Sequence, residues 1–169
     1  MHVADGVDRG GQGGKAQARP RIRYDYDSVK DRPLAERCII WPHEGPPMQP
    51  VGYNSNLSFV QGPGWVAITQ EMIHDTRMIP IDNRPHVGSA IREYMGDSVG
   101  HWDGDTLAVD SAGFNDRFWF DFAGHPHTKQ LHVVERFSRP DFDHLAYDVT
   151  IDDPGAYTRP FTLHGKSVY

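Results

Sequence analysis

The fold is decided by the stretch Leu131-His-Val-Val-Glu-Arg-Phe-Ser-Arg-Pro-Asp-Phe-Asp-His-Leu-Ala-Tyr-Asp-Val-Thr-Ile-Asp152. Every second residue from Leu145 to Ile151 is apolar, so these side chains share one face of an extended chain. The segment 140–143 interrupts the pattern with proline and aspartate, which are typical of turns. The stretch therefore predicts an antiparallel hairpin, with strands over 131–138 and 145–152 and one face of each in the core.

Similar signals recur on both sides of this hairpin. The Asp103-Gly104 pair is the strongest further turn signal and predicts a hairpin between strands 99–102 and 106–110. Helix is expected only as a turn over 31–37 and as a short helix over 90–95. The remaining short apolar runs predict strands over 38–41, 57–61, 65–73, 77–81 and 157–163.

The strand count and the hairpin connections indicate an all-β, mainly antiparallel fold. Seven or eight strands in this order favour a meandering barrel or a strongly curved sheet of the calycin or lipocalin type. A β-sandwich is the alternative architecture. Because a barrel of about eight strands can enclose one small ligand, a small molecule is the expected partner.

Composition and charge narrow the function classes. The 169 residues suit one domain over 22–169, preceded by a basic, low-complexity arm over 1–21 that is expected to be disordered. Residues 24–169 carry 12 basic and 21 acidic residues, which argues against nucleic acid as a partner. No apolar run is long enough for a membrane span. No export signal is visible, which predicts a cytoplasmic protein, or an exported one if the native N-terminus is missing.

Glu135 is the first candidate for chemistry. It falls on the same strand face as the apolar residues Val133 and Phe137, and a carboxylate in such a place needs a partner. Two interpretations stay open. Glu135 is either a buried acid with a raised pKa or a charge held by an arginine, for which the candidates are Arg77, Arg92 and Arg117.

His74 and Asp75 form the second candidate, because a histidine beside a carboxylate can act as a general base near neutral pH. The alternative is a polar turn in which Asp75 bonds local backbone. Charged and aromatic side chains that could bind a substrate are Arg77, His86, Trp102 and Trp119.

Metal binding is the third candidate. Three imidazoles fall close together in sequence, at His125, His127 and His132, and imidazole is a zinc ligand. Asp103 and Asp105 supply the oxygen ligands that calcium prefers. A divalent ion, calcium or zinc, is therefore the expected cofactor, and the alternative is a solvated histidine-rich loop with ordinary turn aspartates. No nucleotide cofactor is expected, because no phosphate-binding glycine motif is present.

Several longer motifs carry a family resemblance over about residues 31–162. They resemble a group of uncharacterised proteins from soil and other environmental bacteria, a resemblance that implies no particular activity. Members of that group are longer, beginning with an export signal and continuing beyond the Thr-Arg-Pro segment, so a truncated gene product is expected here. The motifs are Glu71-Met-Ile-His-Asp-Thr-Arg-Met-Ile-Pro-Ile-Asp82, Met95-Gly-Asp-Ser-Val-Gly-His-Trp-Asp-Gly-Asp-Thr-Leu107, Leu131-His-Val-Val-Glu-Arg-Phe137 and Asp152-Asp-Pro-Gly-Ala-Tyr-Thr-Arg-Pro160.

Two functions are predicted. The first is a small β-barrel hydrolase that uses metal-assisted or general acid/base chemistry on a small neutral ester, lactone or glycoside. In it, His74 and Asp75 are the base pair and Glu135 is the acid. The alternative is a lipocalin-like module that binds an apolar or aromatic small molecule without catalysis. The oligomeric state is left open.

Overall fold

The computed structural model describes residues 28–49, 53–121 and 123–168, so the predicted arm over 1–21 lies outside the described residues. The described part is all-β, with two 3₁₀ turns, η1 (Val29–Asp31) and η2 (Met72–His74), and none of its helices has the length or apolar character to span a bilayer. The strands are β1 (Leu57–Gly62), β2 (Trp65–Gln70), β3 (Thr76–Pro80), β4 (Asp97–Asp103), β5 (Thr106–Ala112), β6 (His132–Asp141), β7 (His144–Asp152) and β8 (Phe161–Val168).

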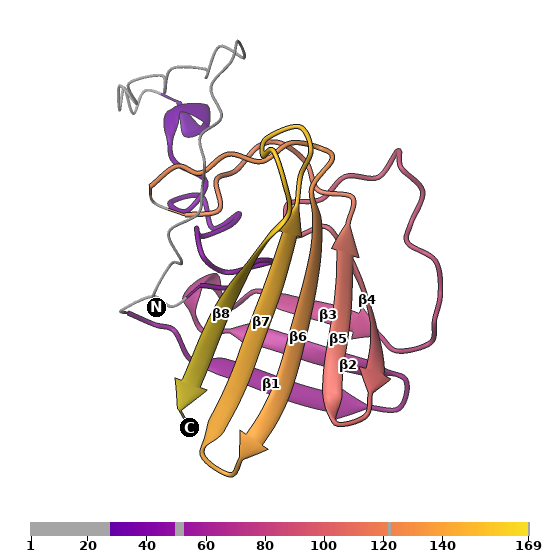
Figure 1. The fold of residues 1–169 in the computed structure, drawn as a ribbon. Coiled ribbons are helices and arrows are strands. Elements are labelled where there is room, and N and C mark those ends of the chain that lie inside the picture. The colour runs from indigo at the N-terminus through magenta and orange to yellow at the C-terminus, as the bar shows by residue number, and fades with distance from the viewer. Residues whose placement is uncertain (1–27, 50–52, 122, 169) are drawn as a thin grey trace.

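The strands form two antiparallel sheets, one in the order β1-β2-β3 and the other in the order β4-β5-β6-β7-β8. Within each sheet every strand pairs antiparallel with its neighbour in the chain, so the predicted all-β, mainly antiparallel fold is confirmed. Among the described residues the two sheets do not close into a barrel. Figure 1 shows β1–β3 lying behind the larger sheet, with their strands running across those of β4–β8.

The hairpin predicted over 131–152 forms the centre of the larger sheet. β6 and β7 pair with Glu135 opposite Val149, and the inward side chains of both strands are buried. The Asp103–Gly104 hairpin also forms, and Gly104 adopts the positive φ of 59° that its turn requires.

Three local predictions are wrong. Residues 90–95 form no helix, since Glu93 makes a parallel bridge to Phe114. Residues 38–41 form no strand, and the Cys38 amide donates to the Ala35 carbonyl in a turn. The predicted strand over 65–73 ends at Gln70, ahead of Ile73, which has a positive φ.

The core lies between the two sheets. Ile68 and Ile79 of the smaller sheet and Val109, Val133 and Val149 of the larger one are all fully buried. Gly100 allows β3 and β4 to approach, because a Cβ there would lie 2.9 Å from Ile79 Cγ2. The side chains of β3 therefore reach the inner face of the larger sheet, and this places the ion pair described next.

Candidate functional site

A buried ion pair joins the two sheets. Arg77 of β3 donates through one guanidinium nitrogen to Glu135 Oε2 at 2.7 Å and through the other to Oε1 at 3.2 Å. The Arg77 side chain is 4% exposed and that of Glu135 is 0% exposed, so both charges have left water. Bidentate geometry of this kind is what offsets the cost of removing two charges from solvent. Of the two interpretations of Glu135, the geometry supports a charge held by an arginine.

Tyr147 of β7 extends this pair to a loop. Its hydroxyl donates to Glu135 Oε1 at 2.8 Å and accepts from the backbone amide of Met48 at 3.0 Å. Burial, followed by the negative charge of Glu135, raises the pKa of Tyr147 well above its usual range, so the hydroxyl keeps its proton. The Arg77–Glu135–Tyr147 network therefore fixes the position of Met48 in the segment 41–49.

The segment 41–49 enters one end of the space between the sheets, and Glu44 through Met48 are buried. Its shape is held by hydrogen bonds within the segment: the Trp41 amide donates to Glu44 Oε2 at 3.1 Å, and His43 Nδ1 bonds Gln49 Oε1 at 3.0 Å. The His43 amide also donates to the Phe120 carbonyl. The loop is thus a fixed wall with polar groups on it.

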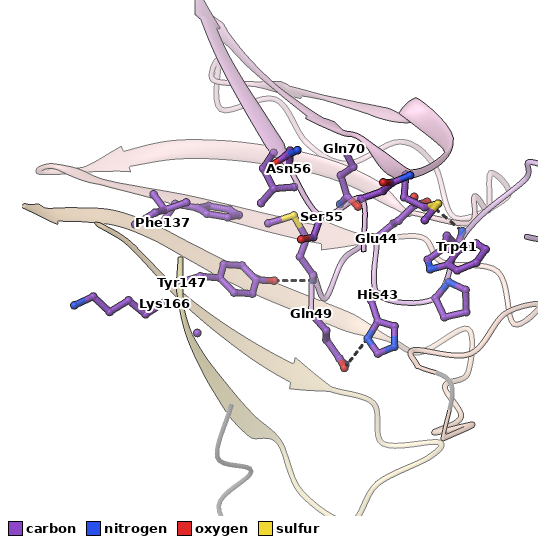
Figure 2. Close-up of a pocket in the computed structure, with 17 residues that line it drawn as sticks. Trp41, His43, Glu44, Gln49, Ser55, Asn56, Gln70, Phe137, Tyr147 and Lys166 are labelled. Atoms are coloured by element: carbon purple, nitrogen blue, oxygen red, sulfur yellow. Dashed lines mark hydrogen bonds between the residues drawn. The ribbon is translucent and has the colours of Figure 1, made fainter. Parts of the chain in front are cut away.

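A cavity of about 150 Å³ lies between this loop and the sheets. Figure 2 shows Phe137 and Tyr147 on one side of it and Gln70 and Glu44 on another. Much of the wall is apolar. The large apolar and aromatic side chains of the wall are Trp41, Met48, Leu57, Met72, Phe137, Leu145 and Tyr147.

Two polar atoms in this wall are buried without a hydrogen-bond partner among the described residues: Glu44 Oε1 and Gln70 Nε2. The two residues are 2% and 7% exposed. They lie on different elements, the loop and the end of β2. A Cβ on Gly45, next to Glu44 in the chain, would stand 3.4 Å from Gln70 Nε2, so the two elements meet here. Buried polar groups normally have a hydrogen-bond partner, so a molecule bound at this part of the cavity could supply the partners of these two atoms.

Glu44 is poised to change protonation near neutral pH. Burial, reinforced by the negative charge of Asp75 and opposed by the Trp41 amide, raises the pKa of Glu44 to about 7. Three basic residues lie in this region of the molecule. His43 precedes Glu44 in the loop and Lys166 also lines the cavity, whereas the guanidinium of Arg77 is paired with Glu135.

This raised pKa predicts a pH-dependent stability difference between the wild type and Glu44→Gln. Between about pH 4.5 and 7 the native state holds a proton on Glu44 that the unfolded chain has released, so this group makes stability fall as pH rises. Glu44→Gln lacks this loss. Its free energy of unfolding, relative to that of the wild type, should therefore rise by about 1–3 kcal/mol between about pH 5 and about pH 8. Urea unfolding of both proteins at these two pH values measures the difference. A difference that stays constant with pH would show that Glu44 titrates normally.

The residues predicted as an acid/base set do not meet at one point. His74 is exposed at the end of η2, with a positive φ of 48°. Asp75 Oδ1 accepts from the Thr76 amide, which matches the polar-turn alternative. Glu135 is fully buried and both of its oxygens are occupied. A substrate at the surface near His74 would therefore not reach Glu135.

The predicted substrate-binding residues are also dispersed. Arg77 is committed to Glu135, and Trp102 and Trp119 are 45% and 42% exposed. His86 bonds two aspartates, Asp97 and Asp110, each at 2.9 Å. Burial lowers the pKa of His86, but the hydrogen bonds and charges of these aspartates outweigh it, and the net shift is upward.

The predicted metal ligands occupy separate places. His125 bonds Asp121, His132 bonds Asp110, and Asp103 pairs with Arg136. His127 is buried against Phe118 and Phe120, and burial lowers the pKa of its ring. Asp105 is exposed in the β4–β5 turn. Over residues 28–49, 53–121 and 123–168, no three His, Cys, Asp or Glu side chains are grouped to hold a metal ion, so these donors do not fit the predicted site.

Glu44 and Gln70 line the cavity but are not among the site residues predicted from the sequence. The neighbours of Glu44 in Pro42-His-Glu-Gly-Pro-Pro47 are typical of an exposed loop, and nothing local shows that the segment turns inward. Gln70 did carry a signal, because it shares a strand face with Val66 and Ile68. An amide on an apolar face was a reason to expect a buried polar site.

Comparisons of the chain with family models, with curated proteins and with solved structures each found no match.

Proposed function

We propose that this chain is a binding module that holds one small, mainly apolar molecule in the cavity between the sheets. A volume of about 150 Å³ is small for a ligand site, since drug-sized molecules occupy roughly 300–1,000 Å³. It is comparable to an engineered cavity of about 150 Å³ that binds benzene. The expected ligand is therefore a molecule with a single ring or a short branched chain.

The observation that carries the proposal is a mainly apolar cavity beside a loop that the buried ion pair and Tyr147 hold in place. Apolar walls supply affinity, and a few fixed polar groups orient the ligand. In this proposal the two crossing sheets are the two sides of a curved, calycin-like meander, and the segment 41–49 is its end wall.

Hydrolysis of a small ester or lactone is the second candidate, favoured by one observation. Glu44 lies in the cavity wall, and its pKa of about 7 suits a general acid or base. In this version Glu44 takes the place of Glu135 as the acid. Incubation of the wild type with phenyl acetate tests this activity, because hydrolysis releases phenol, and Glu44→Gln should release none above the uncatalysed rate.

Filling the cavity should weaken binding. Gly165 of β8 lies opposite Tyr147 and lines the cavity, and a Cβ there would meet Tyr147 Cδ1 at an ordinary 3.5 Å. In Gly165→Leu the added side chain projects over Tyr147, so the Kd for toluene and phenol should rise at least about tenfold, or 1.4 kcal/mol. Saturation-transfer NMR and titration measure it.

The matched control is His164→Leu. His164 is the preceding residue on β8, and its side chain is 74% exposed, so this leucine points to solvent. Toluene binding should be unchanged. If no single-ring probe binds the wild type, or if Gly165→Leu binds as the wild type does, the proposed function is wrong.

A further inference from the structure

The two unpartnered polar atoms in the cavity wall differ in hydrogen-bonding character. Gln70 Nε2 is a donor, and Glu44 Oε1 is an acceptor when the carboxyl is ionised. Neither has a partner within the described parts of the chain, and each residue is more than nine-tenths buried. An unsatisfied buried polar group costs about 1–3 kcal/mol, so a molecule that satisfies both atoms is favoured over one that satisfies neither.

Resting on the proposed binding function, we propose that the cavity selects a single-ring molecule that carries a carboxamide or lactam group. The ligand carbonyl accepts from Gln70 Nε2, and the ligand N–H donates to Glu44 Oε1. A carboxamide carries one acceptor and one donor in a single planar group, which matches the one donor and one acceptor of the wall. The ring packs against Phe137, Leu57 and Leu145.

The charges around the two atoms disfavour the main competitors. A carboxylate ligand has no donor for Glu44, and the negative charges of Glu44 and Asp75 repel it. The guanidinium of Arg77, which could have attracted an anion, is paired with Glu135. An ammonium ligand would satisfy Glu44 but would set N–H against N–H at Gln70.

The selectivity is tested by comparing benzamide, benzoate, benzylamine and toluene on the wild type at about pH 8, where Glu44 is mostly ionised. We expect benzamide to bind at least about tenfold more tightly than toluene, which corresponds to about 1.4 kcal/mol. Benzoate and benzylamine should bind more weakly than benzamide. Isothermal titration calorimetry gives all four Kd values.

Two variants assign the preference to the two atoms. In Glu44→Gln the side-chain oxygen can stay on the Trp41 amide, which turns an N–H donor toward the ligand. In Gln70→Met the donor is replaced by an apolar chain of similar length. Each variant should lose the benzamide preference while still binding toluene. Glu36→Gln is the matched control, because Glu36 is 43% exposed in an ion pair with Arg32, and it should leave all Kd values unchanged.

The outcomes separate this inference from the proposed function. Toluene binding without a benzamide preference overturns the inference and leaves the proposed function standing. Two other results overturn the inference in the same way: tighter binding of benzoate or benzylamine than of benzamide, and a benzamide preference that survives both variants. If none of the four probes binds, the proposed function falls together with the inference.

Discussion

Replacing Arg77 by methionine is expected to lower the free energy of unfolding by about 3–5 kcal/mol, as is replacing Glu135 by leucine. Each change leaves one charge buried between the sheets without its partner, since both side chains are at most 4% exposed. Urea unfolding followed by tryptophan fluorescence measures the loss. The double variant Arg77→Met/Glu135→Leu should recover most of it, because an apolar pair has no charge to desolvate.

An exposed ion pair provides the control. Arg136 and Asp103 approach to the same 2.7 Å, but their side chains are 45% and 61% exposed. Arg136→Met should therefore cost less than about 1 kcal/mol. If Arg77→Met costs no more than Arg136→Met, the buried pair does not hold the sheets together, and other contacts must fix the cavity wall.

Replacing Phe137 by alanine is expected to have a second large effect, a loss of about 3–5 kcal/mol together with a change of ligand size. Phe137 is 4% exposed, packs edge-on against Phe59 at 5.5 Å and lines the cavity. Its removal therefore enlarges the cavity at the cost of core contacts. Phe137→Ala should bind a two-ring probe such as naphthalene that the wild type rejects, and naphthalene should raise the melting temperature of the variant alone.

The control for this change is Phe142→Ala. Phe142 is 83% exposed in the β6–β7 turn, so its loss should change stability by about 0.5 kcal/mol or less and leave ligand size unchanged. Equal naphthalene binding by Phe137→Ala and the wild type would show that Phe137 does not limit the cavity. A stability loss below about 1 kcal/mol would contradict its place in the core.

By itself, the sequence determined most of the strands, their antiparallel order and the inward direction of Glu135. These follow from short-range physics: alternation with period two in β7, and turn chemistry at Asp103–Gly104. It also predicted that Glu135 needs a partner and named Arg77 among three candidates. The choice among them depended on how the two sheets cross.

Only the tertiary structure decided which polar groups share a site. Histidine and aspartate residues that are close in sequence, such as His125 and His132, bond different aspartates. Glu44 and Gln70 both line the cavity, because the segment 41–49 enters the space between the sheets and the hydroxyl of Tyr147 bonds its backbone. The physical reason is that burial and long-range contacts depend on the packing of whole sheets, which no local spacing encodes.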